Sequence, residues 1–439
     1  MGRKNYHGHV WMSFRGSSTS RDATQSMRCF AWVISSTIPS RLPTSGRGSQ
    51  KHSRRILGRI PLSFWFQAIT IPLRRSPFGL QLTPFAHGSS TRRSSRPGMT
   101  ASEFRTDPIT GRVAILVPGR SARPNEHAIA PPTAAVDPNC PFCEGNEGKT
   151  PAEVAVVAPA ARPPNSPGWH VRVIPNRFPT VTTDVAPSLT APEPSPPIPS
   201  PAFGYHEVVI ESPTHSPSLG LLPREQVARV IRTCRDRVRY LSHRPYVGSV
   251  TLFENTGPES GGSLWHPHAQ LVTVPEMSPA LREELAGAES YRARTGSRCA
   301  FEAVGAEEIR SGERRVLESA DFVGYAPFAS AVPYEVRLVP HRHMRSFGEM
   351  TDEETTTLAT DLSDLLGAFL ATLPGGSYNY VVRSPGPATA ATESYHWHLD
   401  FLPRLIRPDG FDLGSGYSVN TVLPEVAAEA LRAALAAKR

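Results

Sequence analysis

The chain has 439 residues, enough for about two to three domains, and 39% of them are hydrophobic, so it can bury a substantial core. It contains no apolar run of about 18 residues and only five unevenly spaced cysteines, which excludes an ordinary membrane-spanning helix and a disulfide scaffold. The net charge of +8 arises in residues 1–98, which hold 16 basic residues and one acid, whereas residues 99–439 hold 31 bases and 38 acids. The acidic balance of residues 99–439 does not support binding to nucleic acid. We expect a cytoplasmic protein without membrane contact.

The N-terminal tract, residues 1–98, is rich in Ser, Arg and Pro and has three interpretations. Its composition resembles a transit segment. Arg54 and Arg55 before an apolar run over 61–73 suggest a secretion signal, but that run is short and far from the terminus. We favour a tract that is either disordered or not part of the working protein, because a segment of different composition begins at Met99. A basic tail for acidic partners has no support in the sequence.

A loop with two arginines follows the first predicted elements. Residues 104–117 predict a hairpin edge, with a turn over 107–111 and a strand that leads to Arg120 and Arg123. Two arginines on one loop suit a diphosphate, since a guanidinium binds phosphate oxygens in pairs. A solvated pair of loop residues is an equally good interpretation. Asn176 and Arg177, next to Phe178, suit a nucleoside or a packed loop.

Cys140 and Cys143 form a C-x-x-C motif. Two thiolates at this spacing can share a metal, and the thioredoxin-like context of a redox motif is absent. His215 and His266 can complete a tetrahedral zinc site, and the alternative is a reduced thiol pair in a loop. Cys234 falls on the apolar stripe of a predicted helix, and Cys299 has no assigned role.

An internal duplication organises the chain beyond residue 99. Glu207, Val208, Ile210 and His215 match Glu335, Val336, Leu338 and His343 at an offset of 128, and His266 and His268 match His396 and His398 at an offset of 130. An ordered series of this length is not expected by chance, so we expect two tandem repeats, residues 99–275 and 276–439. The first repeat would contain the candidate zinc site and His268, whose possible role as a nucleophile is argued below.

Each repeat predicts the same elements in the same order. A strand comes first and then an amphipathic helix, which in the second repeat begins with a capping box of Thr351 and Glu354. A second strand, a turn and a last strand with His-x-His follow. The predicted strands are 206–211, 250–254, 334–339 and 378–383, and the predicted helices are 227–241, 358–370 and 424–438. This order indicates an α+β fold with antiparallel sheets and helices packed on one face.

The His-x-His motif of the first repeat follows a glycine-rich turn. On a strand, His266, His268 and Gln270 would line one face. Gly257, Gly261 and Gly262 allow a tight turn whose backbone N–H groups accept phosphate oxygens. A neutral imidazole at such a turn can attack phosphorus and divide a transfer into two steps. The alternative is two surface histidines after a flexible turn.

Taken together, these motifs resemble the galactose-1-phosphate uridylyltransferase family, the two-repeat branch of the histidine-triad superfamily. The resemblance runs from about Phe104 to about Arg432. It implies that His268 takes UMP from UDP-glucose, that galactose 1-phosphate then accepts it by a ping-pong route, and that the enzyme is a homodimer whose partner subunit contributes to the site. The implied roles are phosphoryl binding by Gln270, Asn255, Gly261, Gly262 and Ser263, diphosphate binding by Arg120 and Arg123, uridine contacts by Asn176 and Arg177, and zinc ligation by Cys140, Cys143, His215 and His266.

Two positions refine this expectation. Hydrolases of the superfamily have a third histidine where Gln270 stands, and a neutral amide cannot titrate, so Gln270 favours a transferase. Some family members bind a second metal through a Glu and three His. Glu284, His396 and His398 match three of these positions, but the fourth falls near Arg383, and a cation in place of a ligand argues against a second metal.

Two rival functions stay open. Relatives with the same His-x-His-x-Gln motif use adenine nucleotides, as ADP-glucose or dinucleoside-polyphosphate phosphorylases, and the sequence does not identify the base. A zinc-stabilised protein that binds nucleotide sugars without catalysis is the third interpretation. It predicts ligand binding that survives His268→Asn and no covalent intermediate.

Overall fold

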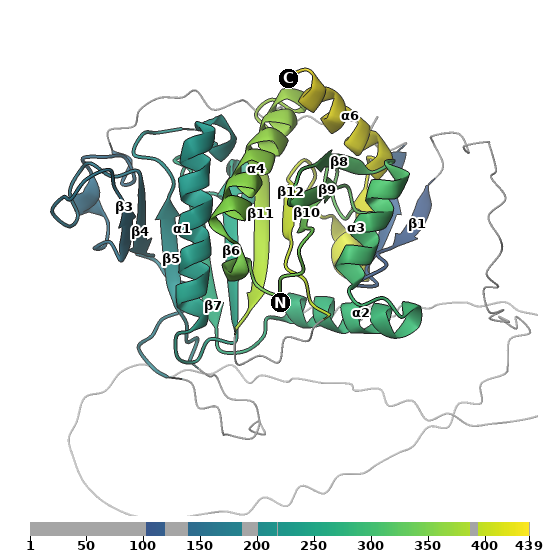
Figure 1. The fold of residues 1–439 in the computed structure, drawn as a ribbon, viewed down its shortest axis with the longest axis horizontal. Helices are drawn as coiled ribbons and strands as arrows, with labels where there is room; N and C mark the ends of the chain where they lie inside the picture. The colour runs from purple at the N-terminus through teal and green to yellow at the C-terminus, as the bar shows by residue number, and fades with distance from the viewer. Residues whose placement is uncertain (1–101, 119–138, 187–200, 217, 387–393, 439) are drawn as a thin grey trace, which may run out of the picture. The chain divides into compact units, whose positions relative to one another are not determined.

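The computed structural model describes residues 102–118, 139–186, 201–216, 218–386 and 394–438 (Figure 1). All of them belong to one compact unit. The expectations for residues 1–98 and for Arg120 and Arg123 lie outside the described residues. Among the described residues, no helix is both long and apolar enough to cross a membrane.

A ten-stranded antiparallel sheet confirms the predicted duplication. Each repeat contributes five strands, and equivalent strands follow in the same order from either edge to the centre, where β6 and β11 pair. Phe253 of β6 pairs with Val381 of β11, and these two residues are equivalent in the repeats. From edge to edge the strands are β3 (Ala155–Val157), β4 (Val171–Pro175), β5 (His206–Ile210), β7 (His268–Val274), β6 (Ser249–Thr256), β11 (Tyr378–Pro385), β12 (Leu399–Pro403), β10 (Val336–Pro340), β9 (Phe322–Tyr325) and β8 (Arg315–Glu318).

Two long helices cover one face of this sheet. α1 (Arg224–Ser242) and α4 (Asp352–Thr372) pack against each other in front of the central strands (Figure 1). Their apolar stripes and the strands form one core that spans both repeats, so the boundary between residues 275 and 276 stays a prediction. The capping box of Thr351 and Glu354 is confirmed. The predicted C-terminal helix is α6 (Pro424–Ala436), which packs on α4.

Further elements form a smaller core, a second sheet and several short helices. α2 (Pro279–Thr295) and α3 (Ala300–Ser311) contribute to a smaller core with β9 and β10. A separate sheet joins the predicted hairpin, β1 (Glu103–Thr106) and β2 (Val113–Leu116), to β13 (Ser418–Asn420). The short helices are η2 (Glu147–Lys149), η3 (Leu219–Leu221), η4 (Pro258–Ser260), η5 (Phe347–Glu349) and α5 (Gly410–Ser415).

The repeat alignment based on sequence is out of register by one residue in β5 and β10. It matches Val208 with Val336, but Val336 belongs to the core under the helices and Val208 packs on the opposite face with Ile174. Because side chains alternate along a strand, a shift of one residue exchanges the two faces. β10 also begins later than predicted, since Tyr334 has a positive φ of 62° that no strand residue adopts.

Candidate active site

His268 is the first residue of β7, and its ring is held in one orientation. Its Nδ1 lies 2.8 Å from the carbonyl oxygen of His266, so the Nδ1–H donates there and Nε2 keeps its lone pair. Burial lowers the pKa of His268, which favours the neutral ring. The ring of Phe142 packs edge-on at 5.2 Å between centroids. The arrangement provides a neutral, oriented nitrogen nucleophile.

Gln270 lies on the same strand, and its amide is oriented by His206 of β5. The Thr180 N–H donates to Nδ1 of His206 at 3.0 Å, which leaves the ring proton on Nε2. That Nε2–H donates to Oε1 of Gln270 at 2.9 Å, and Nδ2 of Asn176 donates to the same oxygen at 3.3 Å. Because the carbonyl end of Gln270 is engaged, its NH2 group is the end available to a phosphoryl oxygen.

Asn255 is oriented in the same manner by the second repeat. Nδ2 of Asn379 in β11 donates to Oδ1 of Asn255 at 2.7 Å and to the carbonyl of Ser260 at 3.1 Å. Nε of Arg404 donates to the side-chain oxygen of Asn379 in turn. The NH2 group of Asn255 is therefore also left for an anionic ligand. A pair of amides from neighbouring strands can donate to the oxygens of one phosphoryl group.

The turn between β6 and β7 needs glycine at two of the predicted positions. Gly257 has a φ of 85°, and a Cβ there would lie 2.3 Å from the hydroxyl oxygen of Ser377. A Cβ at Gly262 would lie 2.8 Å from the Asn255 carbonyl oxygen. This close approach brings the Gly261–Gly262 backbone next to Asn255, with Ser263 exposed after it. The turn is open towards solvent where a phosphate would enter.

The four predicted zinc ligands come together in one cluster. Nδ1 of His266 lies 3.6 Å from Sγ of Cys140 and 3.6 Å from Sγ of Cys143, and Nδ1 of His215 lies 3.7 Å from Sγ of Cys143. A tetrahedron with Zn–S bonds of about 2.3 Å and Zn–N bonds of about 2.05 Å has S···N edges of about 3.6 Å. Nε2 of His266 lies 2.8 Å from the carbonyl of Ser212, which directs Nδ1 towards the sulfurs. The donor set and its spacing fit zinc.

β7 begins at His268, so His266 precedes the strand and does not continue its face. His266 therefore belongs to the cluster with the two cysteines and His215, whereas His268 lies on the same strand as Gln270. The ring of Phe142 packs edge-on against both His266 and His268. Asn176, predicted to approach the nucleoside, lies in the Gln270 network instead. Arg177 donates to the Lys149 carbonyl at 3.4 Å, and the neighbouring Phe178 is 83% exposed.

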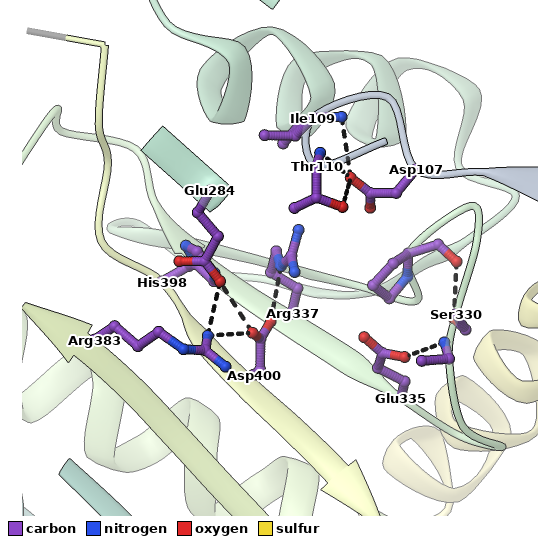
Figure 2. Close-up of polar contacts among 12 residues, drawn as sticks. Asp107, Ile109, Thr110, Glu284, Ser330, Glu335, Arg337, Arg383, His398 and Asp400 are labelled. Carbon is purple, nitrogen blue, oxygen red and sulfur yellow. Dashed lines mark hydrogen bonds and ion pairs between the residues drawn. The ribbon is translucent and has the colours of Figure 1, made fainter. Parts of the chain in front are cut away.

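The three residues matched to a second metal site do not form one cluster. Nη1 of Arg383 lies 2.8 Å from Oε1 of Glu284 and 3.1 Å from Oδ2 of Asp400, with His398 beside them (Figure 2). The guanidinium thus supplies positive charge between these carboxylates, while the ligand atoms of Glu284, His398 and Asp400 lie within 4.8 Å of one another, so the second metal site stays an open prediction. His396 lies elsewhere, in a group with Cys299, Glu302 and His343.

Sequence reasoning missed His206, Phe142 and Asn379. A period of two from Val208 and Ile210 places His206 on the face that carries Gln270, so the strand pattern contained a usable signal for His206. Phe142 stands between the two cysteines in the sequence, a position that places its ring near the metal ligands, and the ring also packs on His268. Asn379 acts across the junction between the repeats, and only the pairing of β6 with β11 reveals it.

Known proteins resemble most of this chain. Residues 96–277 match the family described as galactose-1-phosphate uridyl transferase, N-terminal domain. ADP-glucose phosphorylase of Arabidopsis thaliana is 31% identical over 75% of this chain and 92% of that protein. Galactose-1-phosphate uridylyltransferase of Streptomyces lividans is 30% identical over 63% of this chain and 67% of that protein.

Solved structures agree with these matches. The crystal structure of the Arabidopsis ADP-glucose phosphorylase with bound ADP-glucose superposes with a TM-score of 0.64 and 29% identity, covering 76% of this chain and 98% of that one. A uridylyltransferase structure superposes with a TM-score of 0.59 and 27% identity, covering 77% of this chain and 99% of that one.

Proposed function

Because the chain belongs to the galactose-1-phosphate uridylyltransferase family and is a nucleotidyltransferase, we propose that it moves UMP from UDP-glucose to galactose 1-phosphate through a uridylyl group on Nε2 of His268. The observation that carries this proposal is the Nδ1 contact of His268 with the His266 carbonyl. It leaves Nε2 as the free nucleophile of a buried neutral ring. The side-chain oxygens of Gln270 and Asn255 are engaged, which leaves their NH2 groups for phosphoryl oxygens.

The proposed reaction has two in-line steps. Nε2 of His268 attacks the α-phosphorus of UDP-glucose, a N–P bond forms, and the P–O bond to the β-phosphate breaks, so that glucose 1-phosphate leaves with the electron pair. The ring becomes positively charged, and its Nδ1–H donates to the His266 carbonyl throughout. The phosphate oxygen of galactose 1-phosphate then attacks the same phosphorus, breaks the N–P bond and restores the neutral ring.

The residues around His268 have separate tasks in both steps. The NH2 groups of Gln270 and Asn255 would donate to the phosphoryl oxygens as charge accumulates on them. Neither amide can accept a proton, so neither activates water against the intermediate. We assign diphosphate binding to Arg120 and Arg123 and the rim of the nucleoside site to Arg177. The backbone of Gly261, Gly262 and Ser263 would approach the phosphates.

We infer that Cys140, Cys143, His215 and His266 hold a zinc ion. Zinc bound there would supply structural cross-linking, not chemistry at phosphorus. His266 would be fixed by it, and the carbonyl of His266 in turn accepts from the nucleophile. The cluster therefore supports the orientation of His268.

Adenylyl transfer from ADP-glucose to phosphate is the second candidate. A specific observation favours it, because the relative named ADP-glucose phosphorylase is 31% identical over 92% of its own length. Both candidates share the same intermediate chemistry and differ in the base and the acceptor. A non-catalytic nucleotide-sugar binder is the third possibility. A homodimer with shared sites and a cytoplasmic location stay predictions.

A single-turnover experiment separates these functions. Purified protein is mixed with UDP-glucose or ADP-glucose without any acceptor, and released glucose 1-phosphate is measured. We expect a burst that approaches one equivalent per chain with UDP-glucose and none with His268→Asn. A burst with ADP-glucose alone would replace uridylyl by adenylyl transfer, and no burst with either donor would favour the binder.

A further inference from the structure

The second repeat holds a cavity of about 320 Å³ between α3, the end of β9 and the turn that follows β1. Figure 2 shows Asp107 and Ile109 of this turn near Arg337, which also lines the cavity. The volume lies at the lower end of the range of about 300–1,000 Å³ in which proteins bind small molecules, and an apolar wall with a few polar groups is typical of such pockets. The apolar lining includes Ile109, Tyr291, Ala303, Val304, Pro327 and Phe328.

Two buried polar groups of the lining have no hydrogen-bond partner. Tyr325 is 1% exposed and Glu308 is 2% exposed. Among the described residues, neither the hydroxyl of Tyr325 nor Oε2 of Glu308 has a partner. A buried polar atom without a partner is costly, and burial raises the pKa of Glu308. Because both residues line the cavity, a bound molecule can supply a donor to Glu308 and an acceptor to Tyr325.

The charged groups of the lining are engaged within the protein, which indicates a neutral ligand. Oδ1 of Asp107 accepts from the backbone N–H groups of Ile109 and Thr110 in its own turn. Each of the two lining guanidinium groups has a carboxylate partner, so neither is left for a phosphate. A charged ligand would therefore be buried without a counter-ion. The ion pairs are Glu308 with Arg314, Arg337 with Asp400, and Glu307 with Arg310.

The sheet register identifies the part of the first repeat that corresponds to this cavity. The His-x-His motifs align β7 with β12, and strand pairing then aligns β5 with β10 and β4 with β9. In this alignment, the pair of Tyr325 and Arg337 in the second repeat takes the place of Ile174 and Val208 in the first. Two lining residues of the cavity thus replace two aliphatic residues at the same positions.

The cavity therefore lies where the first repeat has the rim of its proposed nucleoside site. The equivalents beyond β4 and β9 are Pro327 for Asn176 and Phe328 for Arg177. Both Pro327 and Phe328 line the cavity. An aromatic ring at this rim suits a planar heterocycle, because offset or edge-on ring contacts are favourable. This step rests on the proposed function, which assigns Arg177 to the rim of the nucleoside site.

We propose that this cavity binds a neutral nucleoside or its base, as a second and non-catalytic site in the second repeat. The heterocycle packs among the apolar side chains, an N–H group of the base donates to Oε2 of Glu308, and a base oxygen or nitrogen accepts from the Tyr325 hydroxyl. Transfer chemistry is not expected here. Asp400 stands at the position of Gln270, and its carboxylate is held by Arg337 and Arg383.

Photolabelling of the full-length protein with 4-thiouridine or 8-azidoadenosine tests this proposal. The protein is irradiated with each nucleoside, and labelled peptides are identified by mass spectrometry. We expect label on the peptides that contain Tyr291 or Phe328, and an excess of uridine or adenosine should remove it. Label confined to the first repeat, label that the excess does not remove, or no label would overturn the proposal.

Two variants locate the binding. Ala303→Trp fills the cavity and should abolish the label in the second repeat. Tyr325→Phe removes only a hydroxyl that has no partner, so it should keep the Tm and raise the nucleoside concentration that halves the label by about 2- to 10-fold. Tyr240→Phe, at a 50% exposed position of α1, is the matched control and should change neither. Equal competition in the two Tyr→Phe variants would contradict the assignment, even where Ala303→Trp does not fold.

The proposed function is measured separately on the same samples. The burst of glucose 1-phosphate should be unchanged in Tyr325→Phe and in folded Ala303→Trp, because neither residue contacts the site of His268. A normal burst without competed label in the second repeat would overturn the second site alone. Competed label without any burst would keep this site and remove the transfer reaction.

Discussion

Nε2 of His206 lies 2.9 Å from Oε1 of Gln270, and this hydrogen bond leaves the NH2 end of the Gln270 amide available to a ligand. The tautomer of His206 is set on its other side by the Thr180 N–H. Burial also lowers the pKa of His206, which keeps the ring neutral. A chain of hydrogen bonds with one direction therefore runs from the backbone of Thr180 through His206 to the Gln270 amide.

His206→Phe should lower kcat by about 10- to 100-fold, because the Gln270 amide loses the partner that orients it, a loss of about 1.5–3 kcal/mol. The KM for the donor should change less, since the effect falls on the transition state. His243→Phe, at the exposed end of α1, is the control and should leave both constants unchanged. A variant with normal kcat would show that His206 does not position Gln270.

Gln270→His should convert part of the transfer into hydrolysis. A titratable ring at this position can activate water against the nucleotidyl intermediate, and general-base catalysis contributes about 100-fold or more. The measurement is the ratio of free nucleotide to transferred nucleotide in the presence of acceptor. Gln270→Asn keeps a neutral amide and should lower the total rate without raising that ratio. An unchanged ratio in Gln270→His would remove the physical argument for a transferase at this position.

Much of this site was predictable because its signals are local. The C-x-x-C spacing, the His-x-His-x-Gln motif and the capping box of Thr351 are contained in short segments. The partners of those motifs were harder, because β-sheet register decides them. His206 meets Gln270 only through the pairing of β5 with β7. Cys299 meets His396 only after the chain has passed through four further strands, β8 to β11, and the helices α3 and α4.

Arg383→Met should destabilise the fold by about 3–5 kcal/mol, because it leaves the buried carboxylate of Glu284 without a guanidinium partner, whereas Asp400 keeps only Arg337. The free energy of unfolding is measured by urea titration. Arg310→Met is the matched control, since Arg310 is 74% exposed in its pair with Glu307 and should cost about 0–1 kcal/mol. Equal losses in the two variants would contradict the view that Arg383 replaces a cation in this cluster.

Glu254→Gln should stabilise the protein at pH 8 but not at pH 5. Burial raises the pKa of Glu254 to about 7 from its ordinary value of 4.5, and Glu211 is buried nearby. Between these two values the folded chain holds a proton that the unfolded chain releases, so stability falls as the pH rises and then stays constant above about 7. A neutral amide lacks this loss, and Thr256 can still donate to it.

Thermal unfolding of both proteins at the two pH values checks this expectation. The difference in Tm between Glu254→Gln and the wild type should grow from pH 5 to pH 8. Glu289→Gln, an exposed position on α2, serves as the control and should show the same small difference at both. A Tm difference for Glu254→Gln that is independent of pH would show that Glu254 ionises without a penalty from burial.

The central claim is a covalent nucleotidyl group on His268, and intact mass spectrometry after incubation with UDP-glucose alone tests it most directly. The proposed function predicts a mass gain of one uridylyl group, mapped by peptide analysis to His268 and absent from His268→Asn. A gain with ADP-glucose only would keep the nucleophile and change the donor. No gain with either nucleotide sugar would contradict the account.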